Sequence, residues 1–274
     1  LGYLSLPDAT EEDVLEQPQT AALQPFDLSA PPLLRAQVIQ TGSTTHIVAL
    51  VLHHIIADAE SVSVLVQELV SIYGKLQAQS PLTLPPLSIQ YVDYASWQRT
   101  LETEQQLDYW QQQLVDSLPL LPLPTDYPRP ATQQFEGGCH RFSLTANQAE
   151  ALQQTSQQHE ATLFMTLLAA FKVLLHRYSR VGDIVVGTPI SNRPDTSLEG
   201  VLGMFVNTLA LRSDLSQPLS FVQLLEQVKE TALSAYANQD VPFEQLVDAL
   251  EIPRNWSHAP LFQVMFVWRA EQPK

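Results

Sequence analysis

Apolar positions in the first half of the chain follow first a strand pattern and then a helical one. Two runs rich in Val, Ile and Leu, residues 34–39 and 46–52, predict strands, and the turn-forming residues 41–43 between them predict a hairpin. The second run is apolar at nearly every position, which predicts a strand buried on both faces. Beyond it, apolar residues fall on one helical stripe and predict a helix over residues 61–76.

The rest of the chain continues to alternate between helices and strands. A long helix is predicted over residues 92–114, and a proline-rich stretch follows it. The later helices are predicted over residues 147–158, 163–178, 221–236 and 243–250, and the later strands over residues 139–144, 183–186, 204–212 and 261–268. This alternation predicts the α/β class, with two sandwich lobes as the simplest architecture.

The proline-rich stretch predicts the boundary between the lobes. Prolines stand at five positions between residues 119 and 130, without helical or strand periodicity around them, which is typical of a connector. We therefore predict a first lobe over residues 1–118, a connector over residues 119–138 and a second lobe over residues 139–274.

Composition excludes several classes of protein. The 274 residues are 45% hydrophobic, enough for a sizeable core. The net charge of −15, with 14 scattered Lys and Arg, argues against a nucleic-acid partner, because phosphate binding needs a basic face. Cys139 is the only cysteine, so an internal disulfide is impossible, and no Cys/His group has zinc spacing. We predict no metal site and a cytoplasmic setting.

The chain shows no membrane or export signal. No apolar run approaches the roughly 20 residues that a membrane-spanning helix needs, so we expect no membrane partner. The first residues carry neither a basic segment nor an initiator methionine, which leads us to expect a piece of a longer polypeptide.

Two histidines and an aspartate stand between the apolar strand and the next helix. His53, His54 and Asp58 follow the strand directly, where a buried strand reaches a surface or cleft. Imidazole exchanges protons near neutrality, because its unperturbed pKa is about 6.5. Spacing alone leaves two interpretations open: a reaction centre, or a core histidine pair satisfied by backbone carbonyls with Asp58 as a helix cap.

The wider sequence resembles one family. His53-His54 with Asp58 resembles the HHxxxDG signature of nonribosomal peptide synthetase condensation domains, and other segments resemble that family in its own order. Those segments are residues 91–98, 124–130, 182–193, 203–212, 238–246 and 260–266. The family's arginine-rich opening segments have no match, and the chain stops where the family adds more of its second lobe. The resemblance therefore predicts a domain truncated at both ends.

The resemblance implies a fold and a reaction. The fold would be two chloramphenicol acetyltransferase-like lobes, both incomplete, forming a V-shaped pseudo-dimer with a tunnel between them. Upstream donor and downstream acceptor carrier domains would bring their phosphopantetheine arms to the tunnel, with an adenylation domain as neighbour. The acceptor amine would attack the donor thioester and form an amide, and no cofactor would be bound permanently.

Site residues follow from the resemblance by position. His54 matches the catalytic histidine, and three roles stay open: orienting the amine, accepting its proton late, or bonding to the intermediate. A strong base is not obligatory, because a free α-amine has a pKa of about 7.7–8.0. His53 matches a packed neighbour. Asp58 matches a structural carboxylate, and its partner arginine corresponds best to Arg193.

Two further positions are candidates for the tunnel or the oxyanion. Asn207 matches a residue near the lobe interface, although a capping or turn-forming asparagine explains the position equally well. Ala59 replaces the family's glycine, and Glu60 stands where a bulky aromatic often follows. A positive φ at Ala59 would cost about 1–2 kcal/mol, and its methyl group would narrow the acceptor path. Among the functions that the resemblance implies, we favour condensation. The alternatives are an epimerisation domain and a catalytically impaired platform that recruits partners.

Overall fold

The computed structural model describes residues 1–7, 10–116, 120–134, 137–253 and 255–269. Its contacts divide the chain into two compact units. Unit 1 consists of Leu1–Thr100 and Arg193–Phe205, and unit 2 consists of Leu101–Asn192 and Val206–Lys274. The predicted lobe boundary, at residues 118 and 119, lies outside the described residues, so the lobe and connector bounds stay a prediction.

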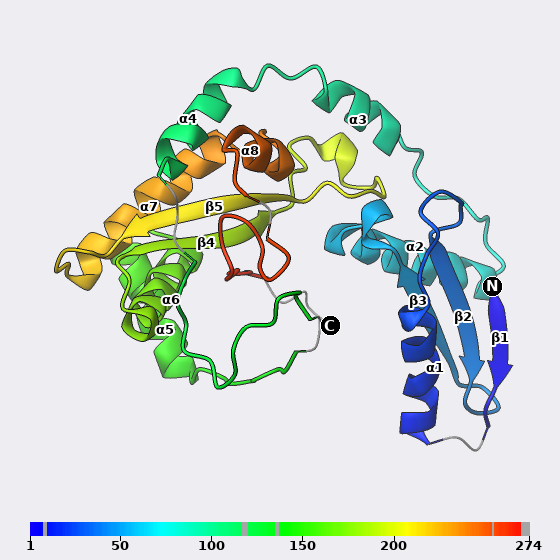
Figure 1. Cartoon of the computed structure of the whole chain (residues 1–274). Coiled ribbons are helices and arrows are strands. Elements are labelled where there is room, and N and C mark those ends of the chain that lie inside the picture. Colours follow the sequence, from blue (N-terminus) through cyan, green and yellow to red (C-terminus); the bar gives the residue numbers. More distant parts are fainter. Residues whose placement is uncertain (8–9, 117–119, 135–136, 254, 270–274) are drawn as a thin grey trace. The chain divides into compact units, whose positions relative to one another are not determined.

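Unit 1 contains a three-stranded sheet in the order β1-β2-β3 (Figure 1). The strands are β1 (Gly2–Ser5), β2 (Leu34–Gln40) and β3 (His46–Leu52). β1 runs parallel to β2, whereas β2 and β3 form the predicted antiparallel hairpin. Thr41 and Gly42 close its turn by donating to the carbonyl oxygen of Thr45. The sequence pattern did not predict β1.

The described residues of unit 1 form the α-helices α1 (Glu11–Leu23), α2 (Ala59–Gln77) and α3 (Tyr91–Gln98). α2 confirms the helix predicted over residues 61–76. The pattern missed α1, which starts at a capping box between Thr10 and Asp13 and packs against β3 and β2 (Figure 1). A 3₁₀ turn, η1 (His54–Ile56), joins β3 to α2.

The long helix predicted over residues 92–114 is wrong. α3 ends at Gln98, and α4 (Glu104–Leu114) begins after a break. Both the backbone N–H and the hydroxyl of Thr100 donate to the carbonyl oxygen of Trp97, at 2.8 and 2.7 Å, which closes α3 with a tight turn. Threonine competes with helical hydrogen bonds in this way, and hydrophobic periodicity does not detect it.

Unit 2 is built on the antiparallel pair β4 (Asp183–Ile190) and β5 (Asn207–Asp214). Helices α6 (Leu163–Ser179) and α7 (Phe221–Ala237) contact each other and the sheet, and α5 (Ala146–Gln158) packs on α6 (Figure 1). α8 (Phe243–Ala249) contacts β5 and α4. These helices confirm the four predicted for the later chain. Ile184, Leu209 and Val228 lie in the buried core between them.

Three predicted strand segments differ from the structure. Residues 139–144 are irregular and exposed, and β5 begins at Asn207 rather than at residue 204. Residues 261–268 contribute one parallel bridge, between Met265 and Gly187, rather than a strand. A strand exists only where a neighbour supplies a hydrogen-bonded ladder, which a β-favouring composition cannot guarantee. At Gly187 an added Cβ would lie 2.3 Å from the Phe262 ring, so glycine permits this close approach.

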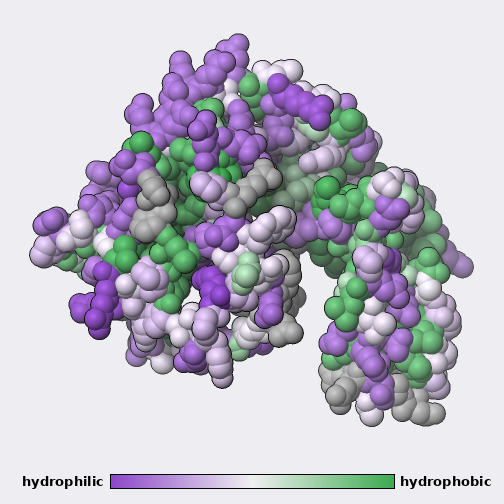
Figure 2. Space-filling model, viewed as in Figure 1, coloured by the Kyte–Doolittle hydropathy of each residue, from purple (hydrophilic) through white to green (hydrophobic). Residues whose placement is uncertain are grey.

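The predicted burial of β3 on both faces is also wrong. Ile47 and Val48 are 41% and 56% exposed, and apolar residues of α2 are exposed as well. Figure 2 shows apolar side chains at the surface of this part of the molecule. A run of Val, Ile and Leu makes a strand suitable for two-sided burial, but burial also requires a packed layer on each face.

Across the described ranges, no single helix is both long and apolar enough to cross a bilayer. The pair α5 and α6, bent by 105°, meets the criteria only when the two helices are counted together. In unit 2 the apolar residues Leu168, Ala169 and Leu175 of α6 are buried in the core, which accounts for its composition.

Candidate active site

His53 is held in place where β3 ends. Its Nδ1 accepts a hydrogen bond of 3.1 Å from the N–H of Ile55, so a neutral ring carries its proton on Nε2. The ring also packs edge-on against Phe26 at 5.9 Å, and the Arg35 guanidinium lies over the Phe26 ring at 3.8 Å. These contacts describe a packed, partly buried histidine, and sequence reasoning missed both of its supporting residues.

His54 differs from its neighbour in both exposure and contacts. It opens the 3₁₀ turn and is exposed, and its imidazole has no hydrogen-bond partner in the part of the chain that the structure describes. The turn ends at Ala57, whose N–H approaches the His54 carbonyl oxygen at 3.4 Å. The backbone is therefore constrained, while neither ring nitrogen is engaged by another described residue.

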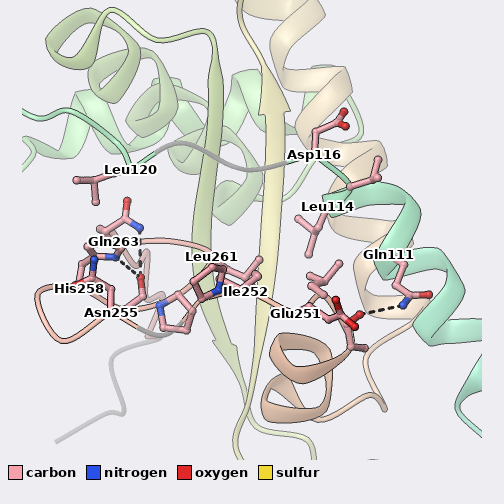
Figure 3. Close-up of a pocket in the computed structure, with 16 residues that line it drawn as sticks. Gln111, Leu114, Asp116, Leu120, Glu251, Ile252, Asn255, His258, Leu261 and Gln263 are labelled. Carbon is pink, nitrogen blue, oxygen red and sulfur yellow. Dashed lines mark hydrogen bonds between the residues drawn. The ribbon is translucent and has the colours of Figure 1, made fainter.

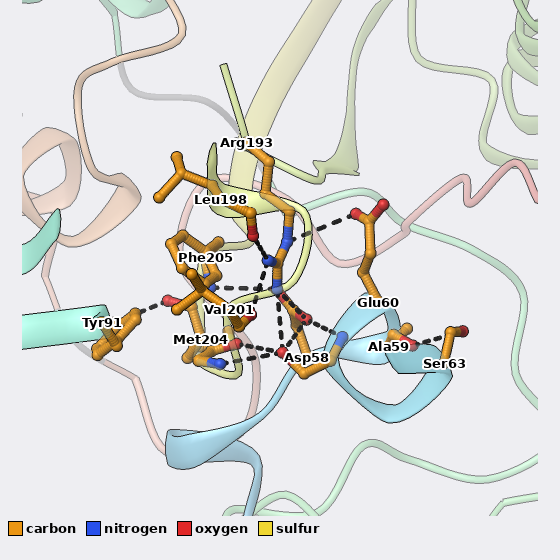
Figure 4. Close-up of polar contacts among 12 residues, drawn as sticks. Asp58, Ala59, Glu60, Ser63, Tyr91, Arg193, Leu198, Val201, Met204 and Phe205 are labelled. Carbon is orange, nitrogen blue, oxygen red and sulfur yellow. Dashed lines mark hydrogen bonds and ion pairs between the residues drawn. The ribbon is translucent and has the colours of Figure 1, made fainter. Parts of the chain in front are cut away.

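Asp58 joins the motif to a distant segment. As the N-cap of α2, its Oδ1 accepts from the backbone N–H and the hydroxyl of Ser61, both at 2.7 Å. The same atom lies 3.2 Å from Nη2 of Arg193, and Oδ2 accepts from the N–H of Phe205 at 3.2 Å (Figure 4). The helix-cap interpretation and the ion pair implied by the resemblance are therefore present together.

These contacts keep the Asp58 carboxylate charged although it is buried. Burial alone would raise its pKa, since it removes water from the ion. The two hydrogen bonds from Ser61 oppose this effect, followed by the positive charge of Arg193 and the N–H of Phe205. Their sum holds the pKa of Asp58 below its usual value. A stable negative charge thus lies four residues after His54.

Arg193 uses almost all of its hydrogen-bond donors in unit 1. Nη1 donates to the carbonyl oxygens of Leu198 and Val201, and Nη2 faces Asp58. The guanidinium also stacks over the Phe205 ring, 4.0 Å from its centre. The remaining Nε has no hydrogen-bond partner among the described residues, and the Glu60 carboxylate lies 3.6 Å from it (Figure 4). Arg193 therefore connects the start of α2 to residues 193–205.

Helix α3 supports the same segment from its aromatic face. The Tyr91 hydroxyl donates to the carbonyl oxygen of Met204 at 2.8 Å, and Tyr94 packs against Phe205 at 4.7 Å. An added Cβ at Gly203 would lie 2.1 Å from the Tyr91 ring, so the backbone can approach this closely only at glycine. Polar contacts from α2 and apolar contacts from α3 thus fix residues 203–205.

The replacement of the family's glycine by Ala59 introduces no backbone strain. Ala59 is the first residue of α2, and it is not among the described residues with positive φ. The predicted cost of a left-handed backbone is therefore absent. Two roles of Ala59 stay predictions: narrowing of the acceptor path, and a contact with the oxyanion.

Asn207 is buried at the start of β5 in unit 2, with its side-chain amide in use. Nδ2 donates to the carbonyl oxygens of Gln239 and Val241, both at 2.8 Å, and Oδ1 accepts from the N–H groups of Thr208 and Phe243. These contacts organise the loop before α8, as expected for a turn-forming asparagine. A role at a tunnel or an oxyanion stays a prediction.

Unit 2 also contains a cavity of about 720 Å³ (Figure 3). The end of α4, the end of α8 and the loop that follows line it. Its polar lining residues are Gln111, Asp116, Glu251, Asn255, His258 and Gln263. None of the predicted site residues belongs to this lining. Within the described ranges, no group of three His, Cys, Asp or Glu side chains is arranged to hold a metal ion.

The fold and the motif geometry define a class of protein. The chain matches the family model of the condensation domain over residues 3–272, and it belongs to that family. It is 50% identical over 250 residues to a subunit of the linear gramicidin synthase of Brevibacillus parabrevis, covering 90% of this chain and 3% of that protein. It is 44% identical over 252 residues to malpibaldin synthetase of Mortierella alpina, and the match covers 90% of this chain and 4% of that protein.

Solved structures agree with this assignment. The X-domain from teicoplanin biosynthesis superposes with a TM-score of 0.87 at 28% identity, covering 95% of this chain and 60% of that one. A second structure contains the X-domain in complex with OxyB. It superposes with a TM-score of 0.87 at 29% identity, covering 96% of this chain and 59% of that one. A four-domain nonribosomal peptide synthetase bound to AMP and glycine also superposes with a TM-score of 0.87, at 29% identity. The match covers 98% of this chain and 20% of that one.

The predicted α/β class is thus confirmed, with the chloramphenicol acetyltransferase-like fold of condensation domains. The V-shaped pseudo-dimer stays a prediction. The chain spans less than two thirds of each of these relatives and solved structures.

Glu60→Gln is expected to lower the free energy of unfolding by less than about 1 kcal/mol, because a half-exposed ion pair is screened by water. Glu60 is 49% exposed and does not hydrogen-bond Arg193. Urea denaturation of the native protein and the variant measures the difference. A loss of several kcal/mol would instead mean that Glu60 shares the charge of Arg193 equally with Asp58.

Proposed function

We propose that this chain forms an amide bond between a donor acyl or peptidyl thioester and the amine of an acceptor aminoacyl thioester. Both substrates would arrive on phosphopantetheine arms of carrier domains, one upstream and one downstream, with an adenylation domain as neighbour. The observation that carries the proposal is the position of His54: an exposed imidazole on a constrained turn, in a chain that belongs to the condensation-domain family.

The reaction requires few functional groups. The acceptor nitrogen attacks the thioester carbonyl carbon, a C–N bond forms, and the carbonyl oxygen becomes an oxyanion. Collapse of this intermediate breaks the C–S bond, and the thiolate takes up the proton that the nitrogen loses. In this proposal His54 orients the amine and accepts the proton late, since an amine with a pKa of about 7.7–8.0 is partly neutral near pH 7.

The other motif residues would act through the backbone. Asp58 is the N-cap of α2, and its carboxylate is engaged by Ser61 and Arg193, so it is not free to share the proton transfer with His54. The same engagement disfavours the epimerisation alternative, which needs a carboxylate partner for exchange of the α-proton. His53 and Arg193 would serve as supports for the turn that presents His54.

A platform function is the second candidate. It is favoured by the similar X-domain that was solved in complex with OxyB. Such a function would use the surface of the fold to recruit a partner and would need no turnover at His54. Amide formation therefore discriminates between the two proposals.

His54→Ala is expected to lower amide formation by about 10²–10⁴-fold, the range for loss of a proton-transferring side chain. The assay uses the chain in its native polypeptide, with loaded donor and acceptor carriers, and follows the amide by mass spectrometry. His46→Ala is the matched control, because His46 is also an exposed histidine of unit 1. Carrier binding without any amide from the native protein would reject condensation and favour the platform.

A further inference from the structure

The hydroxyl of Ser61 lies at the centre of the polar contacts around Asp58. Ser61 is 1% exposed, and its Oγ lies 2.7 Å from Oδ1 of Asp58 and 3.0 Å from Nη2 of Arg193. It also lies 2.8 Å from the carbonyl oxygen and 3.0 Å from the nitrogen of Gly203. One small side chain in the first turn of α2 thus contacts both ends of the ion pair and a backbone segment 142 residues away.

The hydrogen atoms can be assigned among these contacts. A hydroxyl donates one hydrogen and accepts two. The N–H of Gly203 and a hydrogen of Arg193 Nη2 occupy the two acceptor positions of Ser61. The single hydroxyl hydrogen points to Asp58 Oδ1 or to the Gly203 carbonyl oxygen. Each of these oxygens also accepts a hydrogen bond from a backbone N–H. The oxygen that the hydroxyl does not face therefore keeps a hydrogen bond.

Ser61 connects the two sides of this network directly. The N–H of Asp58 donates to the same Gly203 carbonyl oxygen at 3.2 Å, so residues 58 and 61 bind the backbone of residue 203 together. The hydrogen bonds from Ser61 also lower the pKa of Asp58 more strongly than the charge of Arg193 does. The constrained turn that carries His54 ends one residue before Asp58.

We propose that Ser61 is a positioning residue for the condensation reaction: its hydroxyl fixes the Asp58 turn against Gly203 and thereby sets where the preceding turn presents His54. The inference rests on the proposed function, because positioning has meaning only if His54 acts on a substrate. Ser61 itself touches no reacting atom. Removing its hydroxyl should therefore lower the rate of the bound complex without changing how carriers bind.

The test compares Ser61→Ala with Ser63→Ala. Ser63 is a serine of the same helix whose hydroxyl donates only to the helical carbonyl oxygen of Ala59, at 3.2 Å. Ser61→Ala is expected to lower kcat by about 10-fold or more, with the KM for both loaded carriers unchanged, because buried partners lose their hydrogen bonds. Ser63→Ala is expected to keep native kcat, and Ser61→Thr, which retains a hydroxyl, should regain part of the loss.

Hydrogen–deuterium exchange provides a readout that does not depend on activity. The amides of Gly203 and Phe205 should exchange faster in Ser61→Ala than in the native protein or in Ser63→Ala. Native kcat in a folded Ser61→Ala overturns the positioning role while the proposed function stands. The positioning role is also overturned if the loss of kcat in Ser61→Ala equals the fraction of unfolded protein measured by thermal melting. If the native chain forms no amide, the proposed function itself fails, and the positioning role fails with it.

Discussion

Arg193→Ala is expected to destabilise unit 1 by about 3–5 kcal/mol, because it leaves the Asp58 carboxylate buried without its counter-charge. The Asp58 side chain is 0% exposed and that of Arg193 is 3% exposed, so water cannot replace the lost partner. The carbonyl oxygens of Leu198 and Val201 lose their donor as well. Urea denaturation, with hydrogen exchange of unit 1 peptides to locate the effect, measures this loss.

Two variants control for the removal of a positive charge. Arg99→Ala removes an exposed arginine from the same unit and is expected to change stability by less than about 0.5 kcal/mol. Adding Asp58→Asn to Arg193→Ala should recover part of the loss, since the buried negative charge disappears. A loss below about 1 kcal/mol in Arg193→Ala would show that hydrogen bonds from Ser61 and Phe205 hold Asp58 without the arginine.

The second large effect concerns the buried lysine of unit 2. Lys172 is 0% exposed, and its ammonium group donates to the Leu211 carbonyl oxygen at 2.9 Å and to the Ser213 hydroxyl at 2.7 Å. Both partners are neutral, and within the described ranges no carboxylate pairs with it. Burial in these surroundings lowers the pKa of Lys172 from 10.5 to about 7.

The stability of unit 2 is therefore expected to increase with pH between about 7 and 10.5. Over that range the unfolded chain binds a proton that the folded protein lacks, so raising the pH favours the folded state. The slope approaches about 1.4 kcal/mol per pH unit, for a total on the order of 5 kcal/mol. Below pH 7 both states are protonated, and the contribution of Lys172 becomes constant.

Lys172→Met should remove this slope and stabilise unit 2 near neutral pH. Urea denaturation at several pH values, followed by hydrogen exchange of unit 2 peptides, measures both effects. Lys229→Met is the matched control, because Lys229 retains some exposure and lies 3.8 and 3.7 Å from the carboxylates of Glu160 and Glu226. A slope that persists in Lys172→Met would assign it to another group.

Local signals in the sequence account for the elements that were predicted correctly. The hairpin of β2 and β3 follows from two apolar runs and a turn between them, and α2 follows from a cap and an apolar stripe. The break between α3 and α4 was missed because the apolar stripe continues past it. The strands expected at residues 139–144 and 261–268 failed because a strand needs a partner that composition does not specify.

Local signals in the sequence likewise identified some residues of the candidate site and missed some of their contacts. His53, His54 and Asp58 were identified because they are close in sequence, and Arg193 was identified only through the family resemblance. Ser61 stands three residues after Asp58, the spacing at which a backbone N–H bonds to an N-cap side chain. No signal in the sequence indicated its contact with Gly203.

The sequence by itself determined the α/β class, most of the helices, the histidine motif and the family. Those properties depend on residues a few positions apart or on ordered segments that can be compared directly. Only the tertiary structure decided the contacts of Asp58 with Phe205 and of Ser61 with Gly203, the burial of Lys172 and the exposure of β3. Periodicity indicates which side chains are suited to burial, whereas burial and pairing depend on which distant segments pack against them.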